Sequence, residues 1–227
     1  MNILFVGSSS SWHNELWLKY FTKDHSVYLF SDKEDYLKDH PFDKVTIIES
    51  EGYLGRVLNF LKVKSHFLYQ INKLISAQYY ASLVDKTILE HNINIVHAHS
   101  LYYGYLSSFI KSKVPVVFTP VGSDVIIHAQ ESQIYKYMAK GAFKRANIIT
   151  GDSILLQKLG YKVGAREDHN SIIQNGVDST VFFPKKNNLR KLYGIEESDI
   201  LIFSPRAVTP IYNIDIIIES LADLKSN

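Results

Sequence analysis

No cysteine occurs among the 227 residues, which excludes disulfide bonds and thiolate metal sites and is typical of a cytoplasmic protein. The sequence also lacks any run of 18 uncharged apolar residues, so no membrane-spanning helix is predicted. The first residues, from Met1 to Gly7, have neither the basic region nor the cleavage site of a signal peptide. A net charge of +2 is too small to indicate a nucleic-acid partner. A hydrophobic content of 46% is sufficient for a sizeable core, which indicates a globular protein.

Short apolar runs alternate with helical patterns along most of the chain. Strands are predicted at residues 2–6, 27–30, 45–48, 95–97, 114–119 and 148–150, and a last short strand stops at Asn175-Gly176. Helices are predicted from Trp12 onward and at residues 54–75, 78–90, 131–145 and 153–159. Such alternation predicts an α/β fold with a Rossmann-like, doubly wound, mostly parallel sheet that is covered on both faces.

The pattern changes after Pro184, where residues 185–188 form a polar stretch. A short helix at 189–193, a strand at 200–204 and a helix at 214–224 follow. One strand–loop–helix unit cannot bury both faces of a sheet. We therefore expect a domain at 1–184 and the start of a second, incomplete α/β domain at 185–227. Apolar side chains along 200–203 and 214–218 should then be exposed, which favours mobility or self-association.

The turn after the first strand is rich in glycine and serine but is not a Gly-x-Gly-x-x-Gly dinucleotide motif. Its two interpretations are a simple tight turn and a set of backbone N–H groups, at Gly7 and Ser8, that hold an anion or a sugar. His13 and Trp17 follow at i and i+4, so they share one face of the next helix.

Two histidines end the strand that begins at Ile95, within the sequence His97-Ala98-His99. Their i and i+2 spacing places both side chains on one face of the sheet. A metal site is disfavoured because no third ligand lies nearby in the sequence. Parallel α/β sheets bind ligands at the carboxyl ends of their strands. His99 is therefore the site candidate, whereas His97 is interpreted as a buried structural residue.

The segment Thr119-Pro120-Val121-Gly122-Ser123-Asp124 runs from a strand into a turn. Ser123 and Asp124 either cap a short helix or contribute polar groups to the same carboxyl edge. Because that edge also carries His13 and His99, we expect these four residues to line one pocket.

Four segments together resemble GT-B glycosyltransferases of family 4, the glycosyl transferases of group 1. They are the opening Val6-Gly7-Ser8 through Trp17, the Gly122-Ser123-Asp124 loop, the run from Ile172 to Pro184, and Phe203-Ser204-Pro205-Arg206. In that family the run from Ile172 to Pro184 corresponds to the junction between the two halves of the protein.

The resemblance implies a hexosyl transfer, with retention, from a nucleotide sugar to a glycan or lipid-linked acceptor in cell-envelope polysaccharide synthesis. It implies that Arg206, together with backbone groups of Gly7 and Ser8, binds the donor phosphate without a metal or other cofactor. The acceptor pocket would comprise His13, His99, Ser123 and Asp124. Arg206 and, less directly, Asp124 would be the catalytic residues. Such enzymes work in the cytoplasm, at the inner face of the membrane.

The sequence departs from the family pattern in three ways. Val121 stands where many members have histidine, and residues 211–214 lack the family's lysine. The family's two glutamates seven residues apart would fall after Asn227. The resemblance therefore implies an acceptor-binding domain with a truncated donor domain, and no sugar transfer by the 227 residues alone.

Two other functions stay open at this point. A sugar-nucleotide epimerase of GT-B-like fold also uses two facing Rossmann-like domains, and a sugar-binding fragment would need no catalysis. Basic residues on the predicted 54–75 helix likewise have two interpretations, a solvated face or a patch for anionic lipid that gives peripheral membrane association. These residues are Arg56, Lys62, Lys64 and Lys73.

Overall fold

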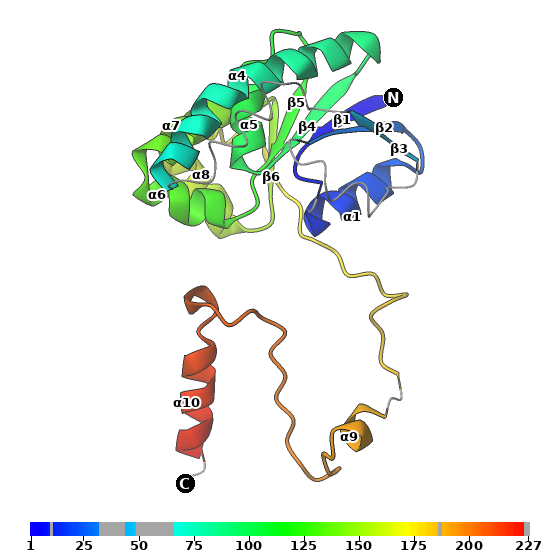
Figure 1. The fold of residues 1–227 in the computed structure, drawn as a ribbon, viewed down its shortest axis with the longest axis vertical. Coiled ribbons are helices and arrows are strands. Elements are labelled where there is room, and N and C mark those ends of the chain that lie inside the picture. Colours follow the sequence, from blue (N-terminus) through cyan, green and yellow to red (C-terminus); the bar gives the residue numbers. More distant parts are fainter. Residues whose placement is uncertain (10, 32–43, 49–65, 186–187, 225–227) are drawn as a thin grey trace. The chain divides into compact units, whose positions relative to one another are not determined.

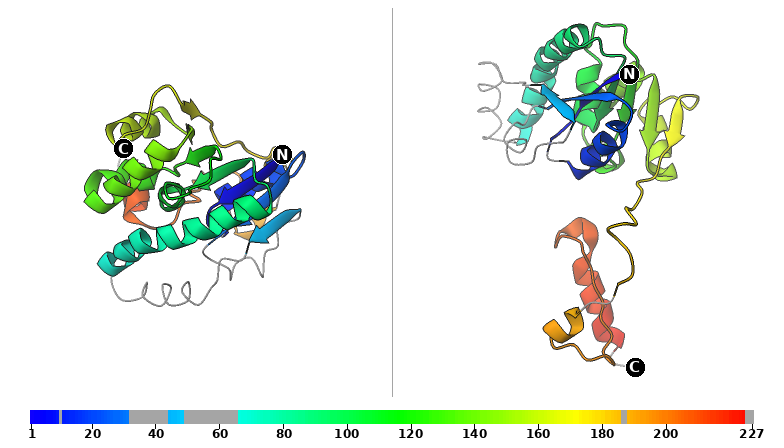
Figure 2. Two further views of the ribbon diagram at one scale, coloured as in Figure 1. Left: turned by 90° about the horizontal axis from the view of Figure 1, so that it is seen from above. Right: turned by 90° about the vertical axis from the view of Figure 1, so that its right-hand side faces the viewer.

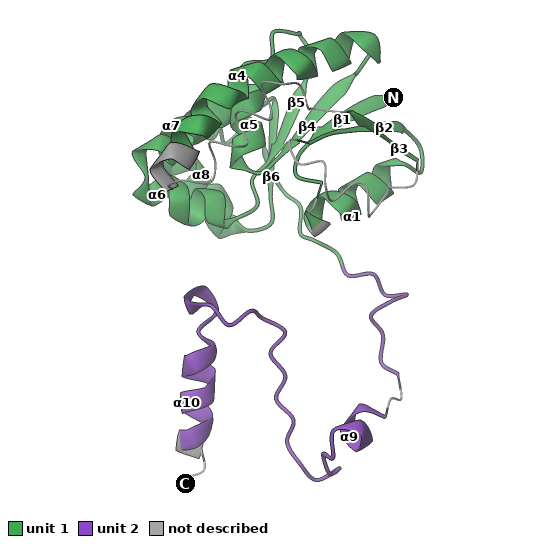
Figure 3. Ribbon diagram, in the orientation of Figure 1, with its two compact units in different colours: residues 1–176 green, residues 177–227 purple. Residues whose placement is uncertain are grey.

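The computed structural model describes residues 1–9, 11–31, 44–48, 66–185 and 188–224. It divides into two units, residues 1–176 and residues 177–227 (Figure 3). The division follows Gly176, whereas the sequence predicts a domain boundary at Pro184. Each unit is described by itself.

A seven-stranded sheet forms the centre of the first unit, in the order β3-β2-β1-β4-β5-β6-β7 (Figure 1). Its strands are β1 (Asn2–Val6), β2 (Ser26–Phe30), β3 (Val45–Ile48), β4 (Ile95–His99), β5 (Val116–Thr119), β6 (Ile148–Gly151) and β7 (Asn170–Ile172). All neighbouring strands pair in parallel. The predicted Rossmann-like α/β fold is thereby confirmed.

Helices connect these strands. They are α1 (Trp12–Phe21), α4 (His66–Glu90), α5 (Leu101–Ser107), a π-helix η1 (Asp124–His128), α6 (Ala129–Glu131), α7 (Gln133–Arg145) and α8 (Ile154–Lys162). Figures 1 and 2 show α4 and α1 on opposite faces of the sheet. No described helix combines the length and the apolar character needed to cross a lipid bilayer.

Side-chain alternation along the strands builds two cores of unequal size. Leu4 of β1 pairs in register with Val96 of β4, and both belong to the larger core under α4, α5 and α7. The next residue, Phe5, faces the other way and packs with Leu18 of α1 in the smaller core. Because Phe5 pairs in register with His97, the two histidines of β4 lie on the α1 face.

Within the larger core, α5 approaches β5 closely at Gly104. A Cβ atom at this position would overlap the buried ring of Phe118. We expect Gly104→Ala to lower the free energy of unfolding by about 2 kcal/mol, because the overlap outweighs the gain in helix propensity. Urea unfolding measures the change. The control is Gly176→Ala, where a Cβ meets nothing within 4 Å and should change stability by less than about 0.5 kcal/mol. Equal effects of the two variants would contradict this packing.

Three sequence predictions differ from the structure. Helices expected at 54–75 and 78–90 correspond to one continuous helix, α4, over its described length from His66, and residues 49–65 lie outside the described residues. The short helix α5 was not predicted, because every one of its residues is buried and no polar face marks its period. Residues 200–204, expected as a strand, belong to no strand, because no other strand of the described second unit offers a partner.

The second unit contains α9 (Leu189–Leu192), a 3₁₀ turn η2 (Pro210–Tyr212) and α10 (Ile214–Leu224). Large apolar side chains are exposed between and along these elements, as expected for a unit without a paired sheet. Ile200 is 90% exposed and Phe203 is 80% exposed, while Ile218 of α10 is 63% exposed.

Candidate functional site

A narrow pocket lies at the carboxyl edge of the sheet, on its α1 face. It is lined by His13, Trp17, His99, Thr119, Pro120, Val121, Gly151, Asp152, Ile173 and Asn175. It encloses about 30 Å³, enough for one or two water molecules, since one water needs about 10–15 Å³. In this unit taken alone, the pocket therefore admits a functional group such as a hydroxyl and not a whole sugar ring.

Helix α1 supplies one wall of this pocket. His13 and Trp17 both line it, as their i, i+4 spacing predicts. His13 is half-buried, and burial lowers its pKa, while the carboxylate of Asp152 acts in the opposite direction. At neutral pH this wall therefore presents an uncharged imidazole.

Strand β4 supplies the floor through His99. The side chain is 2% exposed, and its ring centroid lies 5.6 Å from that of Trp17 and 5.5 Å from that of Phe5. Neither ring nitrogen has a hydrogen-bond partner among the described residues. Burial, together with the neighbouring His97 and His13, holds the pKa of His99 well below its usual value. His99 is therefore neutral, although the absence of a polar partner makes its burial costly.

His97 precedes His99 by two residues on β4, on the same face of the sheet, and has a different environment. Its Nε2 is 2.8 Å from Oγ1 of Thr119, which is itself 2.5 Å from Oγ1 of Thr150. These contacts connect β4, β5 and β6 across the α1 face. Burial lowers the pKa of His97 to about 3. A partnered, neutral imidazole fits the structural role that the sequence predicts for it.

The Gly7-Ser8 turn is held from below by a side chain that the sequence analysis did not single out. Asn14 of α1 donates from Nδ2 to the carbonyl oxygen of Ser8 at 2.7 Å. A Cβ atom on Gly7 would overlap the side-chain amide of Asn14, so a larger residue at this position would displace Asn14. Ser31 also contacts this turn: its Oγ accepts a hydrogen bond from the Ser9 amide at 3.1 Å. The phosphate-binding role of Gly7 and Ser8 stays a prediction.

Asp124 and Ser123 are not among the residues that line the pocket. Asp124 is 8% exposed, and its Oδ2 accepts the amide hydrogen of Leu101 at 2.7 Å. Its Oδ1 accepts from Val125 at 2.9 Å. Burial raises the pKa of Asp124, and these backbone donors oppose the shift. Of the two interpretations that the sequence allows for Asp124, the structure is nearer to the first, in which the carboxylate accepts from backbone amides. Ser123 is exposed at the start of η1.

Two polar residues of the pocket come from segments that the site prediction omitted. Asp152 follows β6 directly, and Asn175 lies just after β7. The rule that selects His99, namely position after a parallel strand, applies equally to Asp152. The helix that follows, α8, is capped by the neighbouring Ser153, whose side chain accepts from the Leu156 amide at 3.3 Å.

Arg206 belongs to the second unit. Its guanidinium carbon lies 5.1 Å from the centroid of the Tyr212 ring, a cation–π contact within that unit. The residue is exposed. Among the basic residues of the predicted 54–75 helix, Lys73 is described, and its Nζ lies 5.6 Å from the Tyr102 ring centroid. Arg56, Lys62 and Lys64 lie outside the described residues.

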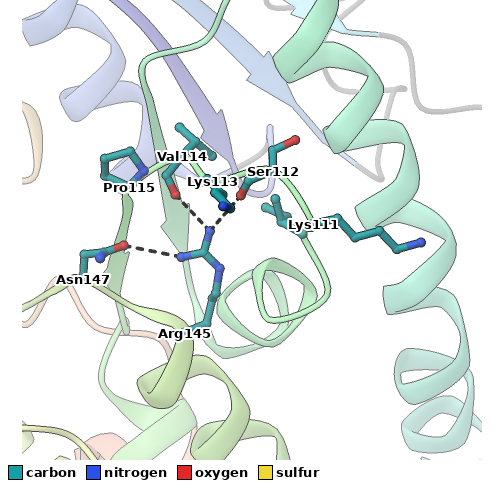
Figure 4. Close-up of a pocket in the computed structure, with 8 residues that line it drawn as sticks. Lys111, Ser112, Lys113, Val114, Pro115, Arg145 and Asn147 are labelled. Atoms are coloured by element: carbon teal, nitrogen blue, oxygen red, sulfur yellow. Dashed lines mark hydrogen bonds between the residues drawn. The ribbon is translucent and has the colours of Figure 1, made fainter.

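A wider pocket of about 390 Å³ opens at the opposite, amino-terminal edge of the sheet (Figure 4). Its Arg145 donates to the carbonyl oxygen of Val114 at 2.9 Å and points toward Ser112 and Asn147 (Figure 4). These bonds hold the loop before β5 in place. Ligands of open parallel sheets bind at the carboxyl edge. The narrow pocket, despite its smaller volume, is therefore the candidate site.

The sequence matches a known protein family over most of the first unit. Residues 2–153 match the family described as glycosyl transferase 4-like. The chain belongs to this family. The match covers β1 to β6 and includes the pocket residues His13, His99 and Asp152. No curated protein matches the sequence at a significant level.

Several solved structures have a fold similar to that of this glycosyl transferase 4-like chain. A glycosyltransferase from Rickettsia africae is 18% identical, with a TM-score of 0.63, and the match covers 100% of this chain and 58% of that one. Sucrose-phosphate synthase from Thermosynechococcus elongatus is 11% identical, with a TM-score of 0.61 and coverage of 87% and 53%. Anabaena HepE, crystallised with UDP and glucose, is 18% identical, with a TM-score of 0.58 and coverage of 86% and 50%.

At these identities the structures show a shared GT-B type of fold and nothing finer. The chain spans about half the length of the solved structures that it matches.

Proposed function

We propose that this chain is the acceptor side of a glycosyltransferase that moves a hexosyl group from a nucleotide sugar to a glycan or lipid-linked acceptor with retention. The observation that carries the proposal is the pocket at the carboxyl edge of the sheet, because its polar residues His13, His99 and Asp152 all lie within the matched family region. HepE, a protein of similar fold, was crystallised with UDP and UDP-glucose, which supports a uridine nucleotide as the first donor to test.

Charge in the pocket favours a neutral ligand there. The imidazoles of His13 and His99 are uncharged at neutral pH because burial lowers the pKa of each, and Asp152 contributes the negative charge. An anionic phosphate would meet repulsion at this point and no cation among the residues that line the pocket. We therefore propose that this pocket receives acceptor hydroxyl groups. Arg206 and, separately, the backbone amides of Gly7 and Ser8 remain the proposed donor-phosphate contacts.

Catalysis under this proposal rests on charge stabilisation at the leaving diphosphate. The guanidinium of Arg206 offers a bidentate, permanently charged pair of donors. Among the described residues, no group of three or more His, Asp or Glu side chains could hold a metal ion. Independence from metals is part of the proposal and is tested by adding chelator to the transfer assay. A location at the inner face of the membrane and self-association through the second unit are likewise proposals.

Transfer itself provides the test. We expect a protein in which this chain is joined to a complete donor domain to transfer label from UDP-[¹⁴C]glucose, or from another member of a panel of nucleotide hexoses, to a glycan or polyprenyl-linked acceptor. NMR of the product should show the anomeric configuration of the donor. A protein that binds none of the nucleotide sugars in the panel and transfers none of them would contradict the proposal.

The pocket is tested separately by His13→Ala. Loss of one hydrogen-bonding group that faces the acceptor should lower kcat/KM for the acceptor on the order of tenfold and leave the Kd for UDP unchanged. The matched control is His169→Ala, which removes an exposed histidine outside the pocket lining. Equal effects of the two variants on acceptor kinetics would remove His13 from the site.

A further inference from the structure

The residue that follows His99 has an unusual backbone conformation. Ser100 has φ 69° and ψ 161°. Side chains with a Cβ atom disfavour this combination, which is left almost entirely to glycine. Such a conformation persists only where the surrounding contacts over-determine it. Ser100 connects β4 directly to α5, so its conformation decides how the strand that carries His99 enters the helix.

Three hydrogen bonds fix this turn. The Ser100 amide donates to the carbonyl oxygen of Thr119 at 2.9 Å, and the Gly104 amide donates to the carbonyl oxygen of Ser100 at 3.0 Å. The third runs from the Leu101 amide to Oδ2 of Asp124 at 2.7 Å. The first two are backbone bonds, whereas the acceptor of the third is a side chain 23 residues away from Leu101 in the sequence.

The same carboxylate organises the neighbouring loop. Asp124 accepts from the amide of Val121 at 3.4 Å through Oδ2 and from the amide of Val125 at 2.9 Å through Oδ1. Gly122, between them, has φ +100°, which turns the chain so that these amides converge. One buried side chain thus connects the β4–α5 turn to the β5–η1 loop. The two segments supply His99 and Val121 to the pocket.

We propose that Asp124 is a positioning residue: its carboxylate holds the strained Ser100 turn and thereby fixes the buried His99 ring at the floor of the pocket. Asp124 does not contact the substrate in this role. The consequence for catalysis rests on the proposed function, while the positioning itself rests on the contacts above. His99 depends on such support because its ring nitrogens have no polar partner among the described residues.

The contacts require a carboxylate and not merely a polar side chain. Each of the three amides is a donor, and both oxygens of an ionised aspartate are acceptors. An asparagine would keep one acceptor and turn an NH₂ group toward a backbone N–H. Asp124→Asn should therefore disturb the turn, although it changes the size of the side chain very little. Ser100→Gly, in contrast, removes the steric cost of the turn without removing any hydrogen bond.

The test is a double-mutant cycle on the 227-residue chain with Asp124→Asn, Ser100→Gly and the double variant. Two quantities are measured: the urea midpoint and the position of the His99 Hε1–Cε1 NMR signal in histidine-labelled protein, assigned with His99→Gln. Ring currents from Trp17 and Phe5 make that signal sensitive to small rotations of the imidazole. We expect Asp124→Asn to shift the signal and lower the midpoint. The double variant should recover at least half of both changes, because glycine adopts the Ser100 conformation unaided.

Asp85→Asn is the matched control. Its carboxylate also accepts loop amides, from Lys111 at 2.9 Å and Ser112 at 2.9 Å, but at the opposite edge of the sheet. It should lower the midpoint and leave the His99 signal in place. An unshifted His99 signal in Asp124→Asn, or effects of Asp124→Asn and Ser100→Gly that simply add, would overturn the proposal.

If Asp124→Asn does not fold, the double variant decides. Folding with a native His99 signal supports positioning, and failure to fold overturns it. None of these measurements uses a substrate. The positioning role can therefore fail while UDP-glucose binding and transfer persist, and it can hold if the proposed function is wrong.

Discussion

Lowering the pH from 7 to 5 should reduce the free energy of unfolding of the first unit by about 2 kcal/mol through His97 alone, and His99, the second buried histidine of β4, should add to this loss. Burial lowers the pKa of His97 to about 3 and holds that of His99 well below its usual value. Both imidazoles are buried on the α1 face of the sheet, with 4% of His97 and 2% of His99 exposed. Folding therefore keeps them neutral across a range in which a solvated histidine takes up a proton.

The direction of the effect follows from proton uptake by the unfolded chain. An unfolded histidine has a pKa of about 6.5. Above this value neither state binds the proton, so the stability is fully present. As the pH falls below 6.5 toward 3, the unfolded state binds protons that the folded state rejects, and stability is progressively lost. Each group whose folded-state pKa lies far below 6.5 contributes a limiting slope of roughly 1.4 kcal/mol per pH unit.

Urea unfolding at pH 5, 6, 7 and 8, followed by tryptophan fluorescence, measures this loss. His99→Asn should reduce the slope to about half, because one of the two titrations is removed. Gly104→Ala is the control, since it lowers the stability at every pH by a packing effect and should leave the slope unchanged. A free energy of unfolding that stays constant between pH 7 and pH 5 would show that the two rings are accessible to water in the folded state.

The fold was predictable because periodicity and strand order follow from short-range patterns. The alternation of strands and helices placed β1, β2, β3 and β6 within a residue or two, and the rule for parallel sheets gave the architecture. The helix α5 escaped because its residues, Leu101 to Ser107, are buried on every side. An element without a polar face carries no period that a sequence can show.

The candidate site was predictable in part for the same reason. Position after a parallel strand selected His99, and helical spacing selected His13 with Trp17, and the structure brings these three residues into one pocket. For Asp124 the sequence allows both a capping role and a place in the pocket, and it does not decide between them. Whether a carboxylate faces a pocket or a set of amides depends on which donors the fold brings near it. Here the left-handed backbone at Ser100 and Gly122 brings them there.

The contact between Asn14 and the Gly7-Ser8 turn was also not predictable from the sequence. An asparagine inside a helix usually faces solvent, yet this one lies 2% exposed beneath the Gly7-Ser8 turn. Its role depends on the close approach that Gly7 allows, which is a property of two elements together. Sequence patterns within a single helix or turn do not predict such a contact between two elements.

The largest effect on function is expected at Arg206. Under the proposed function its guanidinium binds the donor diphosphate, and loss of a charged hydrogen-bonding group typically costs on the order of 2–4 kcal/mol. In a protein that joins this chain to a complete donor domain, Arg206→Ala should therefore lower turnover ~30- to 1000-fold with UDP-glucose as donor. Arg206→Lys should restore only part of the loss, because an ammonium keeps the charge but not the planar fork that matches a phosphate.

The contact with Tyr212 sharpens this test. The ring lies against the guanidinium, 5.1 Å from centroid to carbon, and so restricts the orientation of the fork. Tyr212→Leu should weaken UDP-glucose binding in the same direction as Arg206→Ala but by a smaller factor, since the charge is retained. Lys191→Ala is the control, because it removes an exposed positive charge from the same unit. Binding is measured by calorimetry and turnover by release of UDP. If Arg206→Ala lowers neither quantity more than Lys191→Ala does, then Arg206 does not bind the donor, and the diphosphate must be neutralised elsewhere.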